Sequence, residues 1–221
     1  MMDDTANMAR ICATAILMVC GANLHAARPG GAQPAPAKAA ATRTAKATTA
    51  AEAKAAAEKG DAAAQFRYAE MLRDGRGVAK NIIEAVKWTR KAADAGHAPA
   101  QCQMGLFYMN GLGVDADEEK AAEWLEKSAS QNFLQAQYNL GLYYERFSDK
   151  EAQRLAVKWL GEAAKQDYAD AQFELARLYL KPRHLASRSP GAGRRAIALL
   201  RLAAAQGHAG AKDALKELGV E

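Results

Sequence analysis

A repeat of about 36 residues dominates this sequence from residue 49 onward. The dipeptide Ala-Gln recurs at residues 64–65, 100–101, 136–137 and 171–172, with spacings of 36, 36 and 35 residues. The same period separates the three tryptophans, and Leu199 takes their position in a fourth unit after a longer connection. These tryptophans are Trp88, Trp124 and Trp159. Two independent markers with one period indicate a stack of repeated units rather than one globular core.

Each unit contains two segments with helical periodicity. In the first segment an apolar residue recurs every four positions, as in Ala100, Met104 and Tyr108. One further position of this segment is always occupied by a small residue, which lets a neighbouring helix approach closely. These small residues are Ala69, Gly105, Gly141 and Ala176. The second segment carries the tryptophan between small residues. The pattern predicts an all-α fold, an α-solenoid of about four stacked helix-turn-helix repeats.

The residue eight positions after each tryptophan position marks where the second helix of a unit is expected to end. The four residues are Gly96, Asn132, Asp167 and Gly207. They are the types that best tolerate the left-handed backbone found at helix C-termini. One period earlier stands Gly60, so residues 49–59 are expected to form a lone second helix at the N-terminal end. At the other end, Ala211, Leu215 and Leu218 repeat the spacing of the first helix and predict a C-terminal half-repeat.

The N-terminal residues resemble an export signal. Residues 11–20 are apolar, too short to span a bilayer, and match the apolar core of a signal peptide. Asp3 and Asp4 oppose the positive charge that usually precedes such a core, and translation from Met8 would remove that conflict. We expect residues 1–26 to be a cleavable signal peptide and the protein to be periplasmic or secreted.

The segment after the signal peptide differs in composition from the repeats. Residues 27–48 consist of Ala, Pro, Thr, Gly and basic residues with almost no large apolar side chain, so they are expected to form a disordered linker to the solenoid at residues 49–221. Signal removal would leave Cys102 as the single cysteine, because Cys12 and Cys20 lie in the apolar core. No internal disulfide framework is then possible.

Charge is unevenly distributed along the chain. Residues 1–57 hold six Lys/Arg and three Asp/Glu, so they carry +3 of the formal net charge of +5. The repeats are nearly neutral, and we do not expect a nucleic-acid partner. Residues 175–212 nevertheless hold eight Lys/Arg and no acid. This basic C-terminal end could bind an acidic partner, anionic lipid headgroups or the acidic second repeat of another copy, or serve only solubility.

Several recurring residues carry a family resemblance. In the first unit they are Gly75, Gly77, Val78, Glu84, Ala85, Trp88, Lys91, Ala92 and Gly96. In the second unit they are Gly105, Tyr108, Gly111, Gly113, Val114, Lys120, Ala121, Trp124 and Lys127. This pattern resembles the Sel1-like repeat, a relative of the tetratricopeptide repeat. The resemblance implies a right-handed α-solenoid whose first helices line the concave side, and an adaptor function, often in bacterial envelopes. Residues 146–150 and 180–193 depart from the family's turn, so different turns are expected there.

Signs of catalysis or metal binding are absent from the sequence. It contains no nucleophile elbow, no P-loop and no His-Glu-x-x-His motif, and the Gly-x-Gly elements at residues 75–77 and 111–113 are interpreted as turns between helices. Cys102 occupies a repeat position that is aromatic in the other units, which predicts a buried thiol. His97 and His208 share one repeat position in distant units, and His184 stands alone in a loop. We therefore expect no enzymatic activity, no cofactor and no metal.

The recurring glutamines allow two interpretations. They could form a ligand-binding ladder, or their amides could hydrogen-bond neighbouring repeats. We favour the second, because scaffold positions recur between repeats whereas binding positions diverge. The glutamines are Gln65, Gln101, Gln137 and Gln172.

A second stripe on the first helices varies from repeat to repeat and is the candidate partner-binding surface. It is offset from the core face and combines charged residues with a central apolar pair. The candidates are Arg67, Glu70, Gln103, Leu106, Asn110, Asn139, Leu142, Arg146, Glu174 and Arg177. We expect a non-catalytic adaptor or scaffold of the cell envelope that binds a protein or peptide there. The alternatives are a cell-wall or β-lactam hydrolase like some disulfide-rich Sel1-like proteins, whose paired cysteines are missing here, and a self-assembling structural spacer.

Overall fold

The computed structural model describes residues 49–181 and 184–220 of the 221-residue chain. Within these ranges the chain forms ten α-helices and one short 3-10 helix, and no strand. The expected signal peptide and linker, residues 1–26 and 27–48, lie outside the described residues. None of the described helices is long and apolar enough to cross a bilayer.

The helices alternate between two repeat positions, which we name A and B in chain order within each unit. The A helices are α3 (Ala62–Asp74), α5 (Ala98–Asn110), α7 (Leu134–Glu145), α9 (Ala169–Leu180) and α11 (Ala209–Glu217). The B helices are α2 (Ala50–Glu58), α4 (Ile82–Asp94), α6 (Glu118–Ser130), α8 (Lys150–Lys165) and α10 (Ala192–Ala205). Four A–B units therefore lie between the lone helices α2 and α11. The predicted all-α solenoid with a half-repeat at each end is confirmed.

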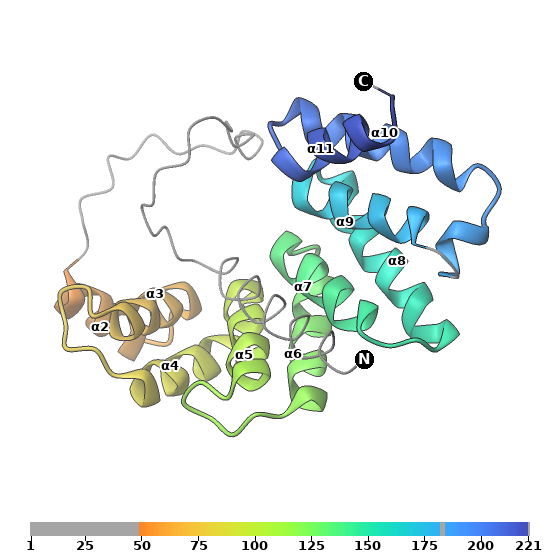
Figure 1. Cartoon of the computed structure of the whole chain (residues 1–221). Helices are drawn as coiled ribbons and strands as arrows, with labels where there is room; N and C mark the ends of the chain where they lie inside the picture. The colour runs from red at the N-terminus through yellow and green to blue at the C-terminus, as the bar shows by residue number, and fades with distance from the viewer. Residues whose placement is uncertain (1–48, 182–183, 221) are drawn as a thin grey trace, which may run out of the picture.

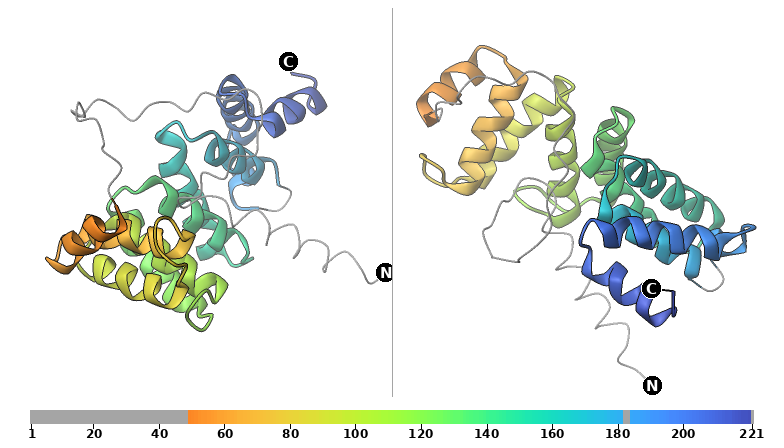
Figure 2. Two further views of the ribbon diagram at one scale, coloured as in Figure 1. Left: turned by 90° about the vertical axis from the view of Figure 1, so that its left-hand side faces the viewer. Right: turned by 90° about the horizontal axis from the view of Figure 1, so that it is seen from above.

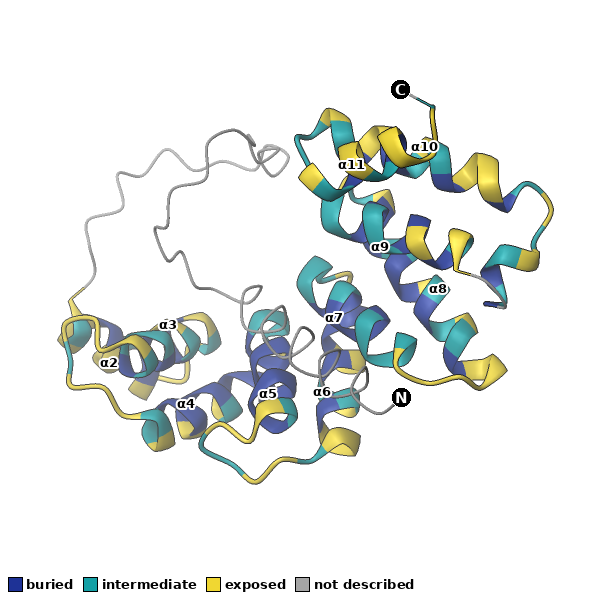
Figure 3. Cartoon of the chain, viewed as in Figure 1, coloured by how far each residue is buried: buried dark blue, intermediate teal, exposed yellow. Residues whose placement is uncertain are grey.

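Each helix packs mainly on its neighbours in the chain, so the stack follows a curved path from α2 to α11 (Figures 1 and 2). The A helices α5, α7 and α9 face the inner side of the curve, and the B helices α6, α8 and α10 face the outer side (Figure 1). Buried residues gather where consecutive helices face each other (Figure 3). The core is thus a continuous seam, and each unit depends on its neighbours for burial.

Helix ends follow the residue types that the sequence provides. The backbone is left-handed at Asn132 (φ +62°) and Asp167 (φ +59°), and also at the glycines that occupy the same repeat position. These glycines are Gly60, Gly96 and Gly207. The predicted stops of the B helices are therefore confirmed. Most B helices begin with a side-chain cap, such as Asp149, whose Oδ1 accepts a hydrogen bond from the Ala152 N–H at 2.9 Å.

The tryptophans and the small A-helix residues fit together in the core. Trp88 and Trp159 are each 8% exposed, whereas Trp124 is only partly buried. A Cβ on Gly105 would lie 2.7 Å from Leu125 Cγ, so the following B helix packs against the bare glycine backbone. The close approach predicted from the small residues is confirmed at this contact.

The turns differ where the sequence departs from the family pattern. The third unit lacks a glycine turn: α7 ends at an Arg146 cap with ordinary right-handed backbone, and α8 is 16 residues long. In the fourth unit a 3-10 helix, Ala186–Arg188, lies in the enlarged connection.

At the C-terminal end, Leu215 is buried as predicted, but Leu218 lies beyond the end of α11 and is 43% exposed. No described helix follows α11 to cover it.

Candidate functional site

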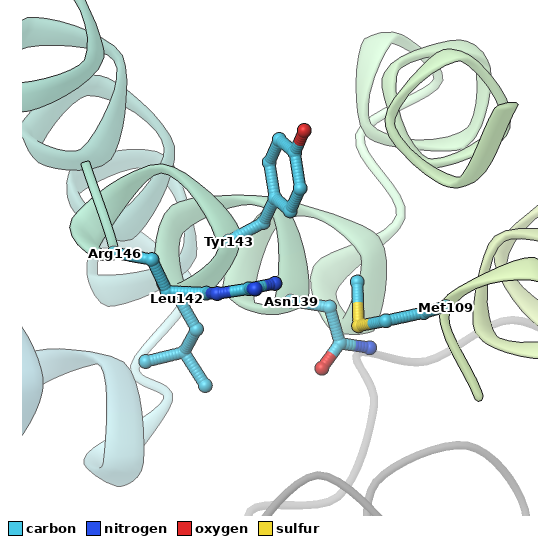
Figure 4. Close-up of a pocket in the computed structure, with 5 residues that line it drawn as sticks. All are labelled: Met109, Asn139, Leu142, Tyr143 and Arg146. Atoms are coloured by element: carbon cyan, nitrogen blue, oxygen red, sulfur yellow. The ribbon is translucent and has the colours of Figure 1, made fainter. Parts of the chain in front are cut away.

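A hollow lies between the neighbouring A helices α5 and α7. It is small and partly open to solvent, with a cavity volume of about 20 Å³, and is lined by Met109 from α5 and by four residues of α7 (Figure 4). Those four are Asn139, Leu142, Tyr143 and Arg146. They share one face of the helix because they stand three, four and seven positions apart. Three of the predicted stripe residues, Asn139, Leu142 and Arg146, thus meet in one place.

The rim of the hollow is aromatic and basic. The Arg146 guanidinium lies 5.9 Å from the centre of the Tyr143 ring, and its Nη2 lies 2.8 Å from the Glu118 carboxylate. Both members of this ion pair are about half exposed, so the pair contributes little to stability and can be exchanged for a ligand contact. Phe147 packs edge-on against Tyr143 at 5.3 Å. Burial raises the pKa of the Tyr143 phenol, which therefore keeps its proton and remains a hydrogen-bond donor at neutral pH.

Three stripe residues are more deeply buried than a binding surface requires. Gln103, Leu106 and Asn139 are 6%, 7% and 5% exposed. Gln103 Oε1 accepts a hydrogen bond from Arg73 Nη1 of the preceding A helix at 2.9 Å. Asn139 Nδ2 contacts the buried Cys102 Sγ at 3.9 Å. The polar members of this set therefore connect adjacent repeats.

The outer members of the stripe are charged or polar. Arg67, Asn110 and Arg177 are exposed. Burial raises the pKa of the Glu70 carboxyl, although Arg73 opposes this shift from 3.9 Å. Burial likewise raises the pKa of Glu174, which accepts a hydrogen bond from Arg177 at 2.6 Å. The predicted stripe therefore divides into an apolar centre at the hollow and a charged region toward each end.

The recurring glutamines bind the repeats together. The Nε2 of Gln101 donates to the Ala93 carbonyl oxygen at 3.1 Å, at the C-terminal end of the preceding B helix. The other three glutamines make the same contact with residues of their own preceding helices at 3.2–3.3 Å. All four side chains are buried. The scaffold interpretation is confirmed, because all four amides donate hydrogen bonds to the preceding B helix.

A second glutamine completes this contact in three repeats. Gln131, Gln166 and Gln206, each at the end of a B helix, donate to the Oε1 of the recurring glutamine at 2.7–2.9 Å. In the first repeat the corresponding residue is Ala95, and the buried Oε1 of Gln65 finds no hydrogen-bond partner among the described residues.

Introducing the missing donor should stabilise the first repeat. Ala95→Gln is expected to raise the free energy of unfolding by about 0.5–1.5 kcal/mol, because it would satisfy the buried Gln65 oxygen. Chemical denaturation followed by circular dichroism would measure the change. Ala95→Glu is the matched control, since a carboxylate of the same shape only accepts hydrogen bonds. Equal stability of the two variants would refute this account.

Histidines occupy structural positions in the described chain. His97 begins α5, its ring lies 5.3 Å from Phe66, and burial lowers its pKa. His208 begins α11, and its Nδ1 accepts a hydrogen bond from the Ala211 N–H at 3.1 Å. His184 is buried in the enlarged connection. Among the described residues, no three His, Cys, Asp or Glu side chains group closely enough to hold a metal ion.

Sequence reasoning missed two residues of the hollow, Met109 and Tyr143. Neither residue belongs to the predicted stripe, and in the other units the position of Tyr143 holds the apolar residues Met71, Phe107 and Leu178. The amphipathic tyrosine at a position that is otherwise fully apolar was the available signal.

Comparison with known proteins agrees with this architecture. The Sel1 repeat profile matches residues 62–97, 98–133, 134–168 and 169–208, more than half of the chain. The crystal structure of a Sel1 repeat protein from Oxalobacter formigenes is 32% identical, with a TM-score of 0.67 over 76% of this chain and 48% of that one.

A second similar structure is c5321, a protective antigen present in uropathogenic Escherichia coli strains that displays an SLR fold. It is 32% identical, with a TM-score of 0.69 over 78% of this chain and 37% of that one. The chain thus spans less than half the length of either structure. No curated protein matches the sequence significantly.

Proposed function

Because the chain belongs to the Sel1 repeat family, we propose that it is a non-catalytic adaptor that binds a protein or peptide on its A helices. Sel1 repeat proteins are generally protein-interaction scaffolds. The observation that carries the proposal is the hollow between α5 and α7. There apolar side chains lie beside Arg146, whose half-exposed ion pair with Glu118 can be exchanged for a contact with a partner.

The chemistry of the hollow suits a peptide segment with one apolar anchor. Leu142 and the flexible Met109 offer apolar surface that adapts to the shape of an entering side chain. Tyr143 adds a rigid ring with a polar tip, a combination that recurs at protein interfaces. Arg146 can exchange Glu118 for a carboxylate or carbonyl of the partner. The anchor would supply most of the affinity, and the arginine would orient the segment.

The cellular setting is part of the proposal. We place the partner in the bacterial envelope, because residues 11–20 have the length and composition of a signal-peptide core. The same setting is common to the alternatives of a cell-wall hydrolase and a self-assembling spacer. The adaptor is favoured over the hydrolase because Cys102 is buried and because the repeats lack the paired cysteines of the disulfide-rich relatives.

A charge placed in the hollow should abolish partner capture. The full-length Leu142→Lys variant is expected to lose a protein that the parent retains from an envelope extract of the natural host, because a buried anchor cannot face an unpaired ammonium group. Ile83→Lys on α4 is the matched control, since Ile83 is 57% exposed and lies on a B helix that does not line the hollow. Circular dichroism would establish that both variants are folded.

The outcome separates the candidate functions. Loss from Leu142→Lys with retention by Ile83→Lys would support the adaptor and its site. Retention of the same partner by both variants would place the binding surface elsewhere. Capture of only further copies of the chain would favour the self-assembling spacer.

A further inference from the structure

The outer face of α10 differs from that of the other B helices. Seven of its residues are exposed. Six of them share one side of the helix, because the later five stand one, four, seven, eight and eleven positions after the first. They are Arg194, Arg195, Ala198, Arg201, Leu202 and Ala205. This side therefore combines three arginines with a leucine and two alanines, and it carries no acid.

The arginines of this face are not neutralised within the described protein. On α8 the exposed Arg154 and Lys165 pair with glutamates three residues away. No described carboxylate forms a salt bridge with Arg194 or Arg195, and Arg201 instead donates to the Val220 carbonyl oxygen at 3.3 Å. Exposed Arg188 in the adjacent 3-10 helix extends the positive surface.

Leu202 makes the same face apolar at its centre. It is 52% exposed, and the other repeats place Lys91, Lys127 and Glu162 at its position. The neighbouring alanines are short, so a flat surface can approach the helix backbone while the arginines extend around it. The N-terminus of α10 also contributes the positive end of its helix dipole beside Arg194.

We propose that this face of α10 is a peripheral binding site for an anionic lipid membrane. A planar partner is favoured because α10 is one of the B helices on the outer side of the curve (Figure 1), whereas the hollow lies between the A helices α5 and α7. The arginines contact lipid phosphates, and Leu202 enters the boundary between headgroups and acyl chains. The inference does not depend on the proposed adaptor function, because it uses different residues on a different side of the solenoid.

Vesicle sedimentation of the full chain would test the proposal. The measured quantity is the difference in binding between phosphatidylcholine vesicles with about 30% phosphatidylglycerol and vesicles of phosphatidylcholine alone. This difference should fall about 100-fold when Arg194, Arg195 and Arg201 are all replaced by glutamine, because each arginine adds roughly a fivefold attraction. Leu202→Gln should weaken it about fivefold. Raising salt from about 50 to about 300 mM should also reduce it.

The control removes the same charge from another B helix. A variant of α8 with Lys150→Gln, Arg154→Gln and Lys165→Gln should keep anionic binding within about threefold of the parent, because a local patch rather than net charge is responsible. Equal binding to both vesicle types would overturn the proposal. So would equal losses in the α8 and α10 variants. A third overturning result would be that inorganic phosphate abolishes vesicle binding where chloride at the same ionic strength does not. That result would mean that the arginines bind free phosphate instead of a membrane.

Discussion

Trp159→Ala should lower the free energy of unfolding by about 3–5 kcal/mol. Trp159 is 8% exposed and packs in one cluster with Leu125 and Leu140, so its ring joins the second repeat to the third. Removal leaves a cavity in the seam that the rigid neighbouring helices cannot close completely. Trp124 is less buried, and its replacement should therefore cost less.

Chemical denaturation monitored by far-ultraviolet circular dichroism would measure this loss. Arg154→Ala in the same helix is the control, because Arg154 is exposed and its replacement should change stability by less than about 0.5 kcal/mol. A loss of less than about 1 kcal/mol for Trp159→Ala would contradict the packing described for the seam.

Gly141→Ala should destabilise the protein by about 1–3 kcal/mol, although alanine is the better helix former. The added Cβ would lie 2.6 Å from Leu160 Cγ and 3.1 Å from the Leu160 backbone nitrogen. Leu160 is fully buried, so relief requires separation of α7 from α8.

A second helical glycine provides a control of opposite sign. Gly161→Ala in α8 places its Cβ in open space, with no atom within 4 Å, and should stabilise the protein by about 0.5–1 kcal/mol. Thermal unfolding of the two variants beside the parent would show opposite shifts. Two shifts in the same direction would mean that helix propensity rather than close packing decides the outcome at Gly141.

The fold was predictable because each backbone or packing constraint recurs at the same position of several repeats. Asn132 and Asp167 occupy a position otherwise held by glycine, which identifies a left-handed backbone that the structure contains. Gly105 and Gly141 align with alanines in the other units, which identifies a helix contact. Each requirement appears several times in one chain, so coincidence at a single position does not obscure it.

The candidate site was only partly predictable because exposure depends on how far adjacent repeats are offset. Helical spacing correctly places Asn139, Leu142 and Arg146 on one face, but it does not show that Asn139 is buried. Met109 lines the hollow from the preceding repeat, 33 positions before Leu142 in the sequence. Whether two such residues meet depends on the curvature of the stack, which periodicity within one helix does not define.

The proposed partner-binding site and the proposed membrane-binding site lie on different helix layers of the solenoid. The hollow belongs to the A helices α5 and α7, and the basic face belongs to the B helix α10. A protein bound to a membrane through α10 would leave its A helices accessible to a partner. Substitutions at Leu142 and at Leu202 should therefore affect partner binding and membrane binding independently.

Site-specific photocrosslinking in the natural host would test the central claim most directly. A photoreactive amino acid would replace either Leu142 in the hollow or Glu123, which is exposed on the B helix α6. The adaptor account predicts a discrete protein adduct from position 142, and no such adduct from position 123. Identical adducts from both positions, or an adduct from position 123 alone, would contradict it.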